Sequence, residues 1–110
     1  MTSVEIKGMM DEAGIPTAYL MFDNDTAVPP PFICFYFDDS DDMFADNINY
    51  VKIRPLTVEL YTETKDYALE GTLETVLTSH GLSYRKTTET YIESERMMMC
   101  VYETEVIFHG

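Results

Sequence analysis

The part of this sequence most suggestive of chemistry is a group of aspartates in which five fall within nine residues. Close carboxylates could bind calcium, and an EF-hand loop needs oxygen ligands at positions 1, 3 and 5, Gly at position 6 and Glu at position 12. A loop starting at Asp38 places Met43 at position 6 and Asn49 at position 12, whereas a start at Asp39 places Met43 at position 5. Neither frame fits, so we predict a solvated loop and no metal site. The aspartates are Asp38, Asp39, Asp41, Asp42 and Asp46.

The same aspartates make a poor catalytic pair. Acid–base catalysis by two carboxyl groups needs unlike environments, so that one group keeps its proton at neutral pH. Adjacent aspartates in one polar loop offer no such contrast. Neither His80 nor His109 lies in a nucleophile–base or metal-ligand spacing, and the sequence contains no glycine-rich phosphate loop. We therefore expect that the protein is not an enzyme and uses no cofactor.

The two cysteines, Cys34 and Cys100, both lie in apolar runs typical of strands. They could form a disulfide if those strands were neighbours. Because cysteine often packs as a small hydrophobic residue, we expect two buried free thiols.

Composition and charge limit the class of protein. The chain of 110 residues suits one domain, and its 45% apolar residues can form a core. Seven basic and 20 acidic residues give a net charge of -13, which disfavours direct binding of nucleic acid or of an anionic membrane. No signal peptide or membrane-spanning run is visible, and we expect synthesis and folding in the cytosol.

The first half of the chain predicts one helix and two extended segments. A helix is expected over residues 3–13, with Ser3 as its N-cap and Gly14 after its end. An extended run over residues 15–22 and a loop over residues 23–31 follow. Residues 32–37 are apolar at every position, which favours an interior strand covered on both faces.

Residues 49–61 predict a long strand whose apolar residues change parity. Val51 and Ile53 point one way, whereas Leu56 and the alternating residues after it point the other way. We expect a β-bulge at Arg54–Pro55 that returns all of them to one face, since proline is tolerated at bulges.

The strongest helical pattern covers residues 63–80. Its apolar stripe consists of Leu69, Leu73, Val76 and Leu77. Its acidic residues are expected mostly on the opposite face: Glu63, Asp66, Glu70 and Glu74. His80 and Gly81 suit the end of the helix. Strands over residues 82–92 and 96–108 are expected to pair through a turn near residues 93–95.

The predicted order is therefore α-β-β-β-α-β-β. This order favours an α+β fold: a mostly antiparallel four- to five-stranded sheet with two helices packed on one face. Residues 1–110 form one predicted domain, with an extended acidic loop at about 38–49.

Two groups of apolar residues could serve either the core or an interface between subunits. Met43 and Phe44 lie inside the acidic loop, and Met97, Met98 and Met99 form a run in the last strand. If the alternate face of that strand is uncovered, its methionines point outward and mark an interface. The candidate interface residues are Met43, Phe44, Asn47, Tyr50, Met97 and Met99.

Four segments resemble one family across residues 14–108: GIPTAYLMFDNDTAVPPPFICFYF, DDMFADNINYVKI, VELYTETKDYALE and YIESERMMMCVYETEVI. They are similar to the tail completion, or tail terminator, proteins of long-tailed bacteriophages and prophages of Gram-positive bacteria. The shared features are packing and loop patterns, not catalytic motifs.

This resemblance implies an α+β fold and a virion structural role. It implies a homo-oligomeric ring, usually hexameric, at the head-proximal end of the tail tube. The ring ends tube polymerisation and offers a surface for head–tail joining. The implied partners are other copies of the chain, the major tail tube protein and a head-completion or neck protein. The implied location is the host cytoplasm during assembly and then the virion.

Other functions remain open at this point. The chain could be another neck or connector component, such as a head-closure or head–tail joining protein. Its charge alone would also suit an acidic DNA mimic that inhibits a host protein. In a ring, an acidic channel would let DNA pass without specific binding, because phosphates are repelled.

Overall fold

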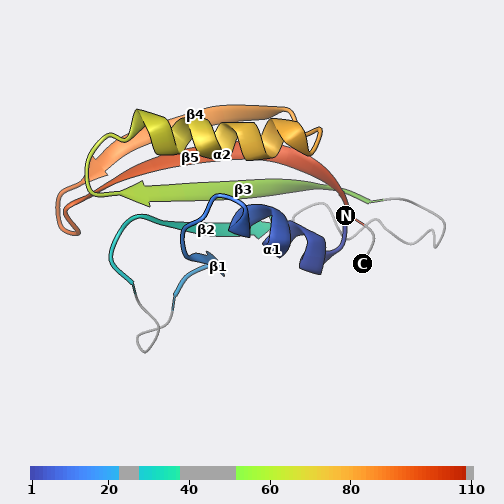
Figure 1. The fold of residues 1–110 in the computed structure, drawn as a ribbon, viewed down its shortest axis with the longest axis horizontal. Coiled ribbons are helices and arrows are strands. Elements are labelled where there is room, and N and C mark those ends of the chain that lie inside the picture. The colour runs from blue at the N-terminus through green and yellow to red at the C-terminus, as the bar shows by residue number, and fades with distance from the viewer. Residues whose placement is uncertain (23–27, 38–51, 109–110) are drawn as a thin grey trace.

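The computed structural model describes residues 1–22, 28–37 and 52–108, which form two helices and a five-stranded sheet (Figure 1). The predicted α+β fold and its order are confirmed, and the sheet is mixed but mostly antiparallel. The elements are α1 (Ser3–Asp11), β1 (Thr17–Tyr19), β2 (Phe32–Phe37), β3 (Lys52–Thr62), α2 (Tyr67–Ser79), β4 (Tyr84–Ile92) and β5 (Met97–Phe108).

The strands lie in the order β1-β2-β3-β5-β4. The β1–β2 pair is parallel, and the other neighbouring pairs are antiparallel. The expected hairpin of the last two strands is present, with Ile92 opposite Met97 at its turn. β5 is an interior strand, because β3 pairs with its other side.

Both helices pack on the same face of the sheet and share one core with it. Each buried strand residue on that face alternates with a residue that points the opposite way. The core members are Ile6, Met9 and Met10 of α1, Ala13 after it, Leu73, Val76 and Leu77 of α2, and Ile33, Phe35, Leu56, Val58, Leu60, Cys100, Tyr102 and Val106 of the sheet. The predicted stripe of α2 is therefore the side that faces the sheet.

The N-cap of α1 is Thr2 and not the predicted Ser3. The Thr2 hydroxyl accepts a 3.2 Å hydrogen bond from the Glu5 amide, and the Thr2 amide donates a 2.7 Å bond to the Glu5 carboxylate. This reciprocal capping box satisfies two amides at once, which a cap at Ser3 would not do. The helix ends at Asp11, and Gly14 takes a left-handed φ of 82° after it.

α2 begins four residues later than predicted, because Asp66 is its N-cap and not part of its first turn. The Asp66 carboxylate accepts a 2.9 Å hydrogen bond from the Leu69 amide. His80 is the C-cap, and Gly81 follows with a φ of 78°. The His80 ring lies 2.9 Å from a carboxylate oxygen of Glu12, which connects the end of α2 to the end of α1.

The bulge expected at Arg54–Pro55 is absent, so that prediction is wrong. β3 pairs with β5 residue by residue from Lys52–Phe108 to Thr62–Met98, and Ile53 points away from the core with 61% of its surface exposed. Pro55 lies outside the described β2–β3 pairs, which begin at Leu56, and it is opposite Glu105 in the β3–β5 register. Val51 lies outside the described residues.

β2 is an interior strand with the predicted bounds, between β1 and β3. Within the described part of the chain, helices cover only one of its faces, and Ile33 and Phe35 point to that side. The alternate residue Cys34 is also buried, at 5% exposure. Cys34 and Cys100 are both free, as predicted, and they point to opposite faces of the sheet.

The described helices are too short and too polar for any of them to cross a bilayer.

Candidate functional site

The sheet has a second face, which points away from both helices; we call it the open face. Its members follow from the strand register, since residues on the two faces alternate along each strand. They are Phe32, Cys34 and Tyr36 of β2, Ile53, Pro55, Thr57, Glu59 and Tyr61 of β3, Met97, Met99, Val101, Glu103, Glu105 and Ile107 of β5, and Arg85, Thr88, Thr90 and Ile92 of β4.

Two of the candidate interface residues, Met97 and Met99, lie on the open face and are partly exposed. Met98 between them points to the helix-covered side. The structure therefore brings Met97, Met99 and Val101 into one outward-facing row along β5. Their role in an interface remains a prediction. The other candidates, Met43, Phe44, Asn47 and Tyr50, lie outside the described residues, as do the five aspartates.

The open face is apolar and aromatic at the end near the β4–β5 turn. The rings of Phe32 and Tyr61 stack with centroids 4.8 Å apart, and Phe22 meets Phe32 edge-on at 5.4 Å. Met99 lies opposite Tyr61 on the next strand. The Tyr61 hydroxyl donates a 2.9 Å hydrogen bond to Glu59, and burial with this acceptor raises the pKa of Tyr61. Apart from the Glu59 carboxylate, the surface at this end is mostly apolar.

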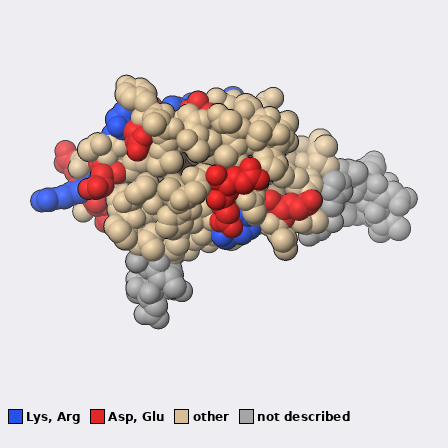
Figure 2. All heavy atoms as spheres, viewed as in Figure 1, with Lys and Arg blue, Asp and Glu red and all other residues tan. Residues whose placement is uncertain are grey.

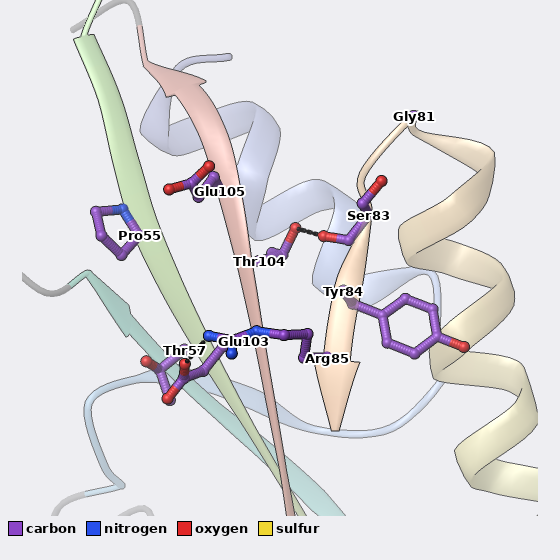
Figure 3. A pocket seen from close by; sticks show the side chains of 9 residues that line it. All are labelled: Pro55, Thr57, Gly81, Ser83, Tyr84, Arg85, Glu103, Thr104 and Glu105. Carbon is purple, nitrogen blue, oxygen red and sulfur yellow. Dashed lines mark hydrogen bonds and ion pairs between the residues drawn. The ribbon is translucent and has the colours of Figure 1, made fainter. Parts of the chain in front are cut away.

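Towards its opposite end the open face has a cavity of about 740 Å³ with several polar lining residues (Figure 3), and the exposed Ile53 and Ile107 lie beyond it. Arg85, Glu103 and Thr57 stand side by side across three strands, and an Arg85 guanidinium nitrogen lies 3.1 Å from a Glu103 carboxylate oxygen. On the helix-covered side of the same strand, the Thr104 hydroxyl donates a hydrogen bond to the Ser83 carbonyl oxygen. The cavity is lined by Pro55, Thr57, Gly81, Ser83, Tyr84, Arg85, Glu103, Thr104 and Glu105.

A second group of polar side chains lies between α2 and the sheet; we call it the Glu70 cluster. Glu70 is only 3% exposed. Its Oε1 accepts hydrogen bonds from Lys86 at 2.7 Å and Lys65 at 2.9 Å, and the Cys100 thiol donates to its Oε2 at 3.4 Å. Lys65 also lies 2.8 Å from Glu89. Burial alone would raise the pKa of Glu70, but the hydrogen bonds from Lys86 and Lys65 lower it overall.

The Glu70 cluster also contains a possible set of metal ligands, since donor atoms of Glu70, Glu89 and Cys100 lie within 4.8 Å of one another. The ammonium groups of Lys65 and Lys86 already neutralise these carboxylates. Burial and the neighbouring Glu70 raise the pKa of Cys100 to about 11, so the thiol keeps its proton, whereas a metal would need the thiolate. These contacts favour an ion-pair cluster over a metal site.

The sequence interpretation placed Glu70 and Glu74 mostly on the exposed side of α2, and for these two residues it was wrong. The Glu74 carboxylate accepts a 2.8 Å hydrogen bond from the buried Tyr102 hydroxyl, and burial with this bond raises the pKa of Tyr102. The signal was in the spacing, because Glu70 precedes Leu73 by three residues and Leu77 by seven. Glu70 therefore belongs to the same stripe, and lysines on β4 and before α2 make its burial tolerable.

The described outer strands are poorly suited to pairing with a further strand. β4 points two charged residues, Lys86 and Glu89, towards the helix side, and its register shifts between Lys86 and Thr88. Inward charges and bulges are devices that discourage strand addition at an edge. β1 at the other edge has only three residues. The open face is therefore the better candidate for an interaction surface.

No family model matches this chain, and no curated protein matches its sequence.

Proposed function

We propose that this protein is a virion structural protein of a bacteriophage or prophage that terminates the tail tube. Its copies form a ring, hexameric as in the family that the sequence resembles, at the head-proximal end of the tube. The ring ends polymerisation of the major tail protein and offers a surface to a head-completion or neck protein. The proposal includes no reaction and no cofactor.

The observation that carries the proposal is the open face with its outward row of Met97, Met99 and Val101. Apolar groups gathered on one exposed side of a small domain mark an interaction surface, and methionine adapts to varied partners. A ring requires two different contact patches on each subunit. The outer strands are disfavoured for this purpose, so the open face is the natural choice for one of the two patches.

The charge of the chain supports the proposed location. With a net charge of -13, the ring would repel DNA that passes through it. On the side of the molecule seen in Figure 2, acidic groups form separate small clusters between large uncharged areas. This pattern offers little support for a DNA mimic, which needs carboxylates in phosphate-like rows. A map of charge in an assembled ring would test the idea, because a basic channel would contradict it.

The experiment that tests the function is deletion of the gene followed by electron microscopy of the lysate. We expect overlong tails that are not attached to heads. Free tails of normal length beside filled heads would instead indicate a connector that joins head to tail. Normal virions would exclude both roles.

A further inference from the structure

We propose that the polar end of the open face binds a partner protein that presents a lysine or arginine beside aliphatic side chains. The proposal concerns the region around Ile53, Glu105 and Ile107; we call it the Glu105 site. It extends the proposed function by stating the chemistry of a partner surface, and it can be tested on the single chain without a ring.

The aliphatic part of the Glu105 site is a pair of isoleucines on neighbouring strands. Ile53 and Ile107 lie directly opposite one another in the β3–β5 register and are 61% and 51% exposed. A directly opposed pair of large aliphatic side chains on an open sheet face offers a continuous apolar contact. A partner that covers it removes both side chains from water.

The charged part of the site lies one row further along the same face. Glu105 lies opposite Pro55, whose side chain has neither a charge nor a hydrogen-bond donor that could bind the Glu105 carboxylate. Glu103 in the next row is already paired with Arg85, but Glu105 is exposed and has no ion-pair partner among the residues that the structure describes. A lysine or arginine could lay its aliphatic stem on the isoleucines and place its charge at Glu105. The adjacent cavity of about 740 Å³ has room for such a side chain.

A second copy of the chain is a poor occupant for this site. Its described basic side chains are mostly bound to its own acids: Lys7 to Asp11, Lys65 and Lys86 to Glu70, and Arg85 to Glu103. Arg96 directly follows Glu95 in the β4–β5 turn, and Glu93 lies in the same turn, so the two glutamates leave that turn acidic overall. Charge complementarity therefore points to a different, basic protein.

The test uses the full ¹⁵N-labelled chain and a synthetic probe, acetyl-Lys-Leu-Arg-Leu-Lys-amide, in an NMR titration. We expect the largest amide shifts at Ile53, Glu105 and Ile107. Two further peptides separate the contributions: one with glutamate in place of each basic residue, and one with glycine in place of each leucine. Both should bind at least about fivefold more weakly, because each removes one of the two kinds of contact.

Matched variants separate the site from the overall charge of the chain. Glu105→Lys should weaken binding of the probe by about fivefold or more. Glu95→Lys makes the same charge change in the β4–β5 turn, away from the site, and should weaken binding by less than about twofold. Ile107→Ser should also weaken it without a change in charge. Circular dichroism checks that each variant is folded.

Three outcomes would overturn the inference. Equal effects of Glu105→Lys and Glu95→Lys would mean that the probe senses only net charge. Shifts that map to another surface would place the contact elsewhere. Shifts at Ile53 and Ile107 that depend on the concentration of the chain alone would show that a second copy covers the site. None of these outcomes bears on tail length in the deletion, so the two proposals can fail independently.

Discussion

The two faces of the sheet both carry glutamates and basic residues, but the structure treats their charges differently. On the face that the helices cover, Glu70 of α2 is almost completely buried, and its carboxylate accepts hydrogen bonds from two ammonium groups and a thiol. On the open face, Glu103 forms an ion pair with the exposed Arg85, and Glu105 has no ion-pair partner in the described chain. A buried carboxylate must be compensated within the protein, whereas an exposed one is solvated by water. Charges on the helix-covered face therefore hold α2 in place, while charges on the open face remain available to a partner.

The largest effect is expected from Glu70→Ala. The substitution leaves Lys65 and Lys86 facing each other without their shared carboxylate, and it opens a gap under α2. Removal of one partner from a buried ion pair costs about 3 kcal/mol, so we expect a loss of that order in the free energy of unfolding. Urea denaturation measures it. A loss below about 1 kcal/mol would mean that the cluster behaves like a surface pair.

The contribution of Glu70 should also depend on pH. Its pKa is lower in the folded chain than the ordinary value of 4.5, so its stabilising effect is fully present above that value. The effect is lost as the pH falls through the lowered folded pKa. The difference in unfolding free energy between the wild type and Glu70→Gln should therefore shrink between about pH 7 and about pH 3. A difference that stays constant over this range would contradict the assigned shift.

A smaller effect is expected from Tyr102→Phe. The variant keeps the buried ring and removes the hydroxyl that donates to Glu74. A net contribution of one hydrogen bond is about 1 kcal/mol, and thermal or urea unfolding can detect a loss of that size. Tyr91→Phe is the matched control, because the Tyr91 side chain is half exposed and should change stability by less than about 0.5 kcal/mol.

The smallest effects on stability are expected on the open face. The double variant Met97→Gln, Met99→Gln should lower the free energy of unfolding by about 1 kcal/mol or less, since both side chains are partly exposed. The same variant should fail to restore tails of normal length when it replaces the deleted gene. Thr88→Gln with Thr90→Gln, on the outer strand of the same face, is the control and should restore them. A Met97/Met99 variant that unfolds would place these side chains in the core.

The elements were largely predictable, and the errors have physical causes. The bounds of β2 and the stripe of α2 follow from local patterns, which the structure confirms. The expected bulge in β3 assumed that every apolar residue must face the core. Ile53 does not, because its strand keeps a regular register with β5 and leaves it on the open face. Glu70 was misplaced because its lysine partners come from other segments and cannot be read from the helix alone.

The candidate interface was predictable only in part. The pattern in the last strand identified Met97 and Met99 as residues of one alternate face, and the structure leaves that face without a helix in the described chain. The Glu105 site was not predictable, because Ile53 and Ile107 are more than 50 residues apart in the chain. Their meeting depends on which strand pairs with β3.

The sequence by itself determined approximately where the helices and strands form, that the chain is strongly acidic and, in the last strand, that Met97 and Met99 share a face. These properties are local, since they depend on the period of a helix or a strand and on composition. Only the tertiary structure decided the strand order β1-β2-β3-β5-β4, the burial of Glu70 against two lysines and the meeting of Ile53, Glu105 and Ile107. These features depend on pairing and packing between distant segments, which local periodicity does not specify.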